Sequence, residues 1–241
     1  MPIWNWWAIK SKTPITKIKK MVTSDNLSKI APTIKADRID IIANALDKIC
    51  PLYGISTPDI FHEFIANVLH ESNEFTTMEE NLNYKTQALI DLFSRSRISI
   101  EDANKYGRNA AHPADKVEIA NHIYGGQWGK VNLGNTKPMD GWIFRGSGAI
   151  QATGRNNITK FTQYYNNKFN MLYTPEDMAN LLRTDIEISI HSACWFFSIS
   201  KKLIQAAIDD NMNEIVKKIN GGYNGINERN RYYELAKKYI V

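Results

Sequence analysis

The chain has 241 residues, of which 43% are hydrophobic and 23% are charged. This composition fits one domain with its own core and excludes a fibrous or disordered chain. Two cysteines are too few for a disulfide-held scaffold, and no apolar run reaches the ~18 residues of a membrane-spanning helix. The net charge of +5 is concentrated in residues 1–38, which carry eight Lys or Arg against two Asp. Such a basic head favours an anionic polymer or surface as partner.

Cap signals and apolar periodicity predict three helices in the first third of the chain. Thr23 is a good N-cap for the first helix. Apolar residues at helical spacing over 39–49 predict a second helix that stops before Pro51. Thr57-Pro58-Asp59 combines a cap, a first-turn proline and an early acid, which predicts a third helix through residues 60–69.

The rest of the chain continues this mainly helical pattern around one long loop. Pro113-Ala-Asp115 opens a helix through Ile123. Residues 124–157, rich in Gly, Asn and Trp, predict a central loop with at most a short hairpin. Strand signals are few, so we expect a mainly α domain with little β structure. Further helices are predicted after the Thr174 cap, over 185–199 as a buried central helix, and over 211–219 and 226–240.

Two glutamates stand out because their surroundings differ. Glu71 falls between Ile60 and Phe64 on a helical wheel, at the edge of the apolar stripe and the end of its helix. Partial desolvation there favours a protonated carboxyl, as a general acid requires, although a surface glutamate at a helix end is the alternative. Glu80 lies in a polar stretch and should stay ionised, unless it is an ordinary surface acid. Such a pair is typical of enzymes that cleave glycosidic bonds.

The central loop adds groups that suit a sugar ligand. Its glycines allow close approach of the backbone, and Gln151, Thr153 and Asn157 can hydrogen-bond sugar hydroxyls, acetamides or a water. Trp128 and Trp142 could stack on sugar faces. A phosphate site is disfavoured because the run lacks GxxxxGK[ST] and no hydrophobic strand precedes it.

Together these segments resemble glycoside hydrolase family 19, most closely its branch of phage endolysins and bacterial lysozyme-like enzymes. Four stretches keep the family's order over roughly residues 25–241, and the resemblance implies a lysozyme-like helical fold. The stretches are His70-Glu71-Ser72, Glu79 to Tyr84 (Glu-Glu-Asn-Leu-Asn-Tyr), Asp140 to Gly154, and Ile219 to Arg229.

The resemblance also implies an inverting mechanism and a set of site residues. Glu71 matches the general acid, Glu80 the general base, and Thr153 a residue that helps to hold the attacking water. Inversion needs carboxyl groups ~6.5–9.5 Å apart, and no metal or cofactor is expected. The positions expected to bind substrate are His70, Asn81, Tyr84, Trp142, Arg145, Gln151, Asn157, Asn220 and Arg229.

Several positions depart from the family pattern. Ser72-Asn73-Glu74 stands where Ser/Thr-Gly-Gly is common, which predicts an extra acid near the site. Ser147 replaces an Arg or Tyr, and Ile158 an aromatic residue. Elsewhere, His191 and Cys194 lie three apart on one apolar helix, and we interpret Cys194 as a buried structural thiol rather than a nucleophile.

We therefore expect a peptidoglycan hydrolase that cuts β-1,4 bonds of the cell-wall glycan. The endolysin-like motifs, the absence of a Cys-rich chitin-binding module and the basic head favour peptidoglycan. The alternatives are a chitinase with the same catalytic residues and a glycan-binding protein with an inactive site. A nucleic-acid binder is suggested by charge alone and is not expected.

The N-terminal segment is predicted to be separate from the catalytic domain, with 1–22 as a basic Trp/Lys-rich segment and 23–241 as the domain. Residues 1–20 combine three tryptophans with five lysines and no acid. This composition suits an anionic envelope or membrane surface, or else a flap packed on the body. The start of the chain lacks signal-peptide features, so we expect the protein to be made in the cytoplasm and to reach the cell wall through a holin or by injection. We also expect a monomer.

Overall fold

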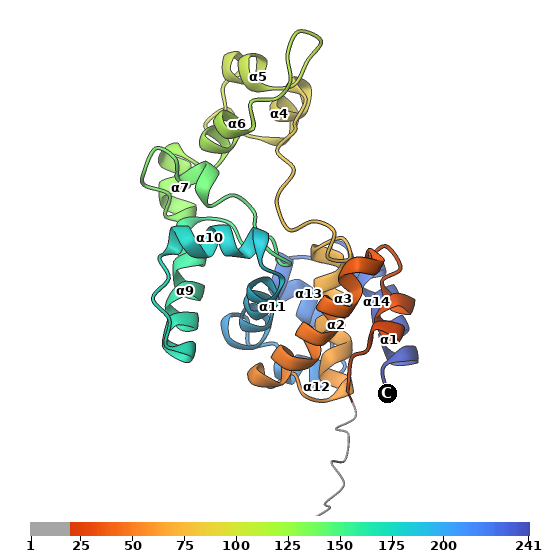
Figure 1. Cartoon of the computed structure of the whole chain (residues 1–241). Helices are drawn as coiled ribbons and strands as arrows, with labels where there is room; N and C mark the ends of the chain where they lie inside the picture. Colours follow the sequence, from red (N-terminus) through yellow and green to blue (C-terminus); the bar gives the residue numbers. More distant parts are fainter. Residues whose placement is uncertain (1–19) are drawn as a thin grey trace, which may run out of the picture.

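The computed structural model describes residues 20–241, and helices make up nearly all of its regular structure (Figure 1). Within this range the β structure consists of isolated bridges, such as Glu79 with Ser147 and Ser147 with Ala152. The mainly α prediction is confirmed. Most of the basic Trp/Lys-rich segment (residues 1–19) lies outside the described residues, so its proposed role stays a prediction. No helix in the described part of the chain is long and apolar enough to cross a membrane.

The largest group of helices, here called the main body, packs on one hydrophobic core. Its central helix, α3, packs along α14 and α12, while α2 packs against α11. Phe61 and Phe64 of α3 are fully buried in this core. The main body comprises α1 (Ser24–Ile30), α2 (Ala36–Ile49), η1 (Cys50–Tyr53), α3 (Pro58–Glu71), α11 (Ile186–Trp195), the π-helical turn η2 (Phe196–Ser200), α12 (Ile204–Ile208), α13 (Met212–Asn220) and α14 (Ile226–Tyr239).

A second, smaller core forms the lobe at the top of Figure 1, here called the small lobe (residues 82–124). It contains α4 (Thr86–Leu92), α5 (Ile100–Tyr106) and α6 (Lys116–Ile123). An extended segment of the chain leads from the main body to this lobe. The first two of these helices are too short for a clear apolar period, so the sequence did not predict them.

A bridging layer (residues 126–184) follows the small lobe in the chain. It contains α7 (Gly126–Leu133), α8 (Asp140–Ile143), α9 (Arg155–Phe169) and α10 (Pro175–Thr184). Its helices α7 and α10 lie between the small lobe and the main body in Figure 1. The predicted loop over 124–157 is therefore wrong at α7 and α8, because Gly- and Asn-rich single or double turns carry no apolar period. Residues 144–154 do form the predicted loop, with the Ser147–Ala152 bridge as its short hairpin.

The predicted caps and helix ends are largely confirmed. The side chains of Thr23, Asp115 and Thr174 each accept a backbone N–H bond at the start of α1, α6 and α10. Thr57 makes no such bond, but Pro58 occupies the first turn of α3. As predicted, α3 ends at Glu71, and this end fixes the position of the carboxylate.

The chain then turns sharply through three residues with left-handed backbone. Asn73, Glu74 and Phe75 have φ of 46°, 55° and 56°. L-residues with side chains rarely adopt this conformation, so other contacts must hold the turn. The hydroxyl of Ser72 accepts the N–H of Phe75 at 2.8 Å, and Phe75 itself is buried in the main core. The turn directs the chain away from α3 and towards Glu80.

Candidate active site

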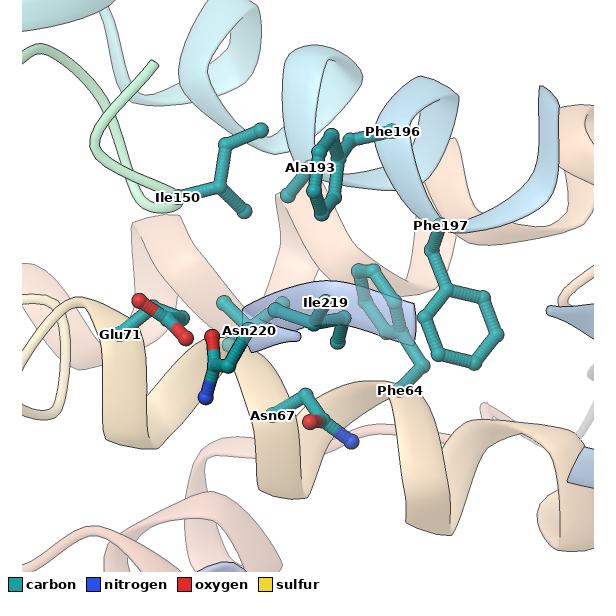
Figure 2. Close-up of a pocket in the computed structure, with 10 residues that line it drawn as sticks. Phe64, Asn67, Glu71, Ile150, Ala193, Phe196, Phe197, Ile219 and Asn220 are labelled. Carbon is teal, nitrogen blue, oxygen red and sulfur yellow. The ribbon is translucent and has the colours of Figure 1, made fainter. Parts of the chain in front are cut away.

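Glu71 lines a cavity of about 140 Å³ between α3, α11, η2 and α13 (Figure 2). In Figure 2, Glu71 lies at one end of this cavity, near Asn220 and Asn67, whereas Phe64 and Phe197 lie at the other end. The predicted acid is thus placed beside apolar surface, as its position on the helical wheel indicated. The full lining is Phe64, Asn67, Val68, Glu71, Ile150, Ala193, Phe196, Phe197, Ile219 and Asn220.

An arginine from α14 holds Glu71 in place. Arg229 is fully buried, and its Nη2 group donates to the Oε1 atom of Glu71. Its Nη1 group donates to the Oδ1 atom of Asn67 at 2.6 Å. A residue with no exposed surface cannot meet a substrate directly, so Arg229 orients the carboxyl group instead of binding the ligand.

Glu80 is fixed by two different donors. The hydroxyl of Tyr124 donates to its Oε1 atom at 2.6 Å, and the backbone N–H of Gly146 donates to its Oε2 atom at 3.2 Å. The backbone N–H of Glu80 also donates to the carbonyl of Gly146 at 3.0 Å. Both carboxyl oxygens of Glu80 therefore have a hydrogen-bond donor. Tyr124 was not predicted from the sequence, because a tyrosine at a helix end carries no distinguishing pattern.

The predicted polar residues of the central loop line a second cavity, of about 370 Å³. Ile150 and Phe196 line both this cavity and the one at Glu71, so the two cavities are neighbours. Gln151, Thr153 and Asn157 are brought together here, as predicted. Other lining residues are Leu133, Ala152, Ile158, Lys160, Phe161, Leu182, Ser192, Trp195, Ser200 and Lys201.

The loop passes close to Glu80 at Gly146, where a side chain would be tightly packed. A Cβ atom on Gly146 would lie 3.0 Å from the Oε1 atom of Gln151 and 3.2 Å from the Oε2 atom of Glu80. The Gln151 amide is held by its Nε2 group, which donates to the carbonyls of Thr77 and Gly148, both at 3.1 Å. The hydroxyl of Thr153 donates to the Gln151 carbonyl at 3.0 Å. Through Gln151 and Gly146, these contacts bring Thr153, the predicted water-holding residue, into the neighbourhood of Glu80.

Some predicted substrate-binding residues lie elsewhere. The ring of Trp142 stacks on the Arg145 guanidinium, 3.6 Å from centroid to carbon, and lines an open groove of the small lobe. Arg145 is buried and ion-paired with Glu79 at 2.6 Å. Tyr84 packs edge-on against Phe93 in the small lobe. Neither the cavity at Glu71 nor the cavity at Gln151 and Thr153 is lined by Trp142, Arg145 or Tyr84, so their predicted role remains without geometric support.

Three further predicted residues make local contacts. His70 pairs through its Nδ1 atom with the Oε2 atom of Glu228 at 2.7 Å, which ties α3 to α14. Asn81 is exposed and accepts the N–H of Asn83 at 3.1 Å. Asn220 lines the cavity of Glu71, and its amide donates to the Asn224 carbonyl at 3.2 Å.

The predicted extra acid, Glu74, is not part of the site. It is buried, and both of its carboxyl oxygens are occupied. Its Oε2 atom accepts the backbone N–H and the hydroxyl of Thr33 at 2.8 and 2.7 Å, and its Oε1 atom accepts the Tyr232 hydroxyl at 2.8 Å. The left-handed turn points Glu74 into the main body, where it links α3 to α14 and to the residues before α2.

The other departures from the family pattern also have structural roles. Ser147 is buried and accepts a hydrogen bond from the Nη1 group of Arg183 at 2.9 Å, while Ile158 is buried in the core of the bridging layer. Cys194 is buried 3.7 Å from the Cys50 sulfur, and burial raises the pKa of its thiol. His191 contacts the Tyr53 hydroxyl, and burial lowers its pKa to about 4.

The described residues show no metal centre. No group of three or more His, Cys, Asp or Glu side chains in residues 20–241 is placed to hold a metal ion.

Comparisons with known proteins agree with this architecture. No family model matches the sequence. Among solved structures, chitinase C from Streptomyces griseus HUT6037 superposes with a TM-score of 0.58 at 13% identity, over 93% of this chain and 95% of that chain. A bacterial family 19 chitinase superposes with a TM-score of 0.52 at 13% identity, over 90% and 95%. At these identities the likeness shows the fold alone.

Sequence similarity identifies the family. A protein of Haemophilus influenzae, described as a glycosyl hydrolase family 19 domain-containing protein, is 34% identical over 171 residues. The match covers 70% of this chain and 74% of that protein. On this similarity and on the shared helical fold, the chain belongs to glycoside hydrolase family 19 and is a glycoside hydrolase.

Proposed function

We propose that this enzyme cuts β-1,4 bonds of the peptidoglycan glycan strand by inversion, with Glu71 as general acid and Glu80 as general base. The observation that carries the assignment is the contrast between the two carboxylates. Glu71 borders an apolar cavity at the end of a rigid helix, whereas Glu80 is held by two hydrogen-bond donors beside the Gln151–Thr153 loop. Opposite settings suit the two opposite proton transfers of inversion.

The proton transfers can be assigned to particular atoms. Arg229 occupies the Oε1 atom of Glu71, which leaves the Oε2 atom to protonate the glycosidic oxygen as the bond to the anomeric carbon breaks. A water, held by Thr153, gives its proton to Glu80 and bonds to the anomeric carbon from the opposite face. Arg229 then stabilises the Glu71 carboxylate that the proton transfer creates, so it favours the transition state.

The charge of the cleft supports peptidoglycan over chitin. Lys160 and Lys201 line the same cavity as Gln151, Thr153 and Asn157. Chitin is a neutral polymer, whereas the muramic acid and stem peptides of peptidoglycan carry carboxylates. Cations beside the sugar-binding groups would strengthen binding of the anionic strand and contribute little to binding of the neutral one.

Two measurements test the proposal. Mass spectrometry of muropeptides after digestion of purified murein should show a cut glycan bond, and chitin oligosaccharides should be cut more slowly. Cleavage of chitin alone would favour the chitinase alternative, and binding without release of reducing ends would favour an inactive glycan-binding protein. Proton NMR of a fresh digest should show the α-anomer first, and a β-anomer would exclude Glu80 as the base of an inverting reaction.

A further inference from the structure

Glu80, the proposed base, accepts a hydrogen bond from a side chain of the small lobe, Tyr124. Tyr124 is the C-cap residue of α6, and its hydroxyl lies 2.6 Å from the Oε1 atom of Glu80. This is the only side-chain hydrogen bond that Glu80 accepts within the described residues, since its other partner is the Gly146 backbone. The contact joins the small lobe to the segment that carries the base.

The tyrosine is held from both its backbone and its ring. Its carbonyl accepts the amide of Asn135 at 2.9 Å, and a Cβ atom on Gly129 would lie 1.9 Å from that same oxygen. The Arg97 guanidinium lies 5.6 Å from the Tyr124 ring centroid and 3.8 Å from that of Trp128. The Nε group of Arg97 also donates to the Ile123 carbonyl at 2.7 Å. Tyr124 thus has little freedom to leave the base.

Burial of Tyr124 makes its hydroxyl the donor in the hydrogen bond to Glu80. Burial, followed by the charge of Glu80, raises the pKa of the Tyr124 hydroxyl. A phenol that keeps its proton can only donate to a carboxylate. The other ionisable groups that face this contact are Tyr84 and Arg97.

We infer that Tyr124 is a positioning residue for the general base. Its hydroxyl fixes the Oε1 atom of Glu80, so that the Oε2 atom faces the Gly146 N–H in the loop that carries Thr153. The inference rests on the proposed function, because it assigns Tyr124 a task in the same inverting reaction. It also gives the small lobe a task, which is to deliver this hydroxyl to the base.

Tyr124→Phe tests the role while keeping the ring and its packing. We expect kcat on murein to fall about 10- to 100-fold, the range that a hydrogen bond to a charged group supports. A carboxylate that loses a donor binds its proton more tightly, so the acid limb of the kcat/KM profile should move up by about one pH unit. Tyr106→Phe, in the same lobe, should leave both rate and profile unchanged, because Tyr106 makes no contact with Glu80.

A double-variant cycle separates positioning from a structural effect. In the Glu80→Gln background, Tyr124→Phe should cost less than threefold, since the group it positions has lost its function. An equal loss in both backgrounds, a loss uniform across pH, or an unchanged profile would overturn the inference. A melting temperature of Tyr124→Phe within a few degrees of the wild type excludes unfolding as the cause.

The same experiment distinguishes the two levels of the proposal. An active wild-type enzyme beside a Tyr124→Phe variant of unchanged profile would overturn the positioning role alone. A wild-type enzyme that releases reducing ends from neither murein nor chitin oligosaccharides would overturn the proposed function and this role with it.

Discussion

The proposed acid and the proposed base are placed by very different parts of the molecule. Glu71 ends a 14-residue helix in the middle of the main core and is oriented by a fully buried arginine. Glu80 lies on an extended segment between two parts of the protein, held by one tyrosine hydroxyl and one backbone strand-like contact. The acid therefore depends on the packing of a large core, while the base depends on a few polar contacts.

The largest effect is expected from the acid itself. Glu71→Gln removes the transferable proton and should lower kcat by at least ~10³-fold, within the range of general acid catalysis. The change is nearly isosteric, so circular dichroism and melting temperature should stay near those of the wild type. Reducing-end release from purified murein measures the rate. Turnover within tenfold of the wild type, by a folded variant, would exclude Glu71 as the acid.

The next largest effect is expected on stability, when the buried arginine that orients Glu71 is replaced. Arg229→Met removes a buried cation and leaves Asn67 and Glu71 without its donors. Loss of one partner of a buried pair costs about 3–5 kcal/mol, and the partial exposure of Glu71 places the expected loss near the lower value. Urea unfolding measures it, with the exposed Arg231→Met as the matched control. Equal stability of the two variants would contradict the buried pair.

Replacement of Glu80 should affect stability less than replacement of Arg229, and the rate somewhat less than replacement of Glu71. Glu80→Gln should lower kcat by ~10²-fold, as expected for the loss of a general base. Because its contacts are few and half-exposed, the free energy of unfolding should change by less than ~1 kcal/mol. Parallel rate and urea measurements test both statements. A large loss of stability would show that the segment depends on Glu80 far more than its contacts indicate.

The last effect is on the pH dependence of stability and concerns a second acid on the helix that carries Glu71. Both carboxyl oxygens of Glu63 are buried without a hydrogen-bond partner in the described structure. Burial, followed by the charge of Asp210, raises its pKa from 4.5 to about 8. Between these values the native state holds a proton that the unfolded state has lost. Stability should therefore fall as pH rises, by up to about 1.4 kcal/mol per pH unit, and level off above pH 8.

Glu63→Gln should remove this slope. The amide cannot ionise, so the difference in unfolding free energy between variant and wild type should grow from pH 5 to pH 8 in favour of the variant. Urea unfolding at several pH values measures the difference. Glu234→Gln, an exposed change on α14, should keep the wild-type slope. Parallel slopes for wild type and Glu63→Gln would show that Glu63 is ionised in the native protein.

Sequence reasoning was most accurate where the signal is local. The caps at Thr23, Asp115 and Thr174 and the end of α3 at Glu71 follow from neighbouring residues, so they could be predicted. The cluster of Gln151, Thr153 and Asn157 followed from their closeness in the sequence, because Asn157 lies in the first turn of α9, directly after the loop.

Contacts between distant segments could not be predicted in this way. Tyr124 meets Glu80 across 44 residues, and Glu74 meets Thr33 across 41, so neither contact leaves a periodic trace in the sequence. The mistaken position of Glu74 has the same origin. Its side-chain direction is set by a left-handed turn, which residue type alone did not indicate for Asn-Glu-Phe.

That turn is part of the short segment, residues 72–79, that joins the two proposed catalytic carboxylates and limits how far apart they can lie. One end of the segment is clamped by α3 at Glu71, the other by the Gly146 backbone at Glu80, and its middle by the anchored Glu74. Because the segment is held at these three points, it cannot take up extra residues without moving at least one of them. An insertion between Ser72 and Glu79 should therefore change the distance or the relative direction of the two carboxylates, while both stay chemically intact.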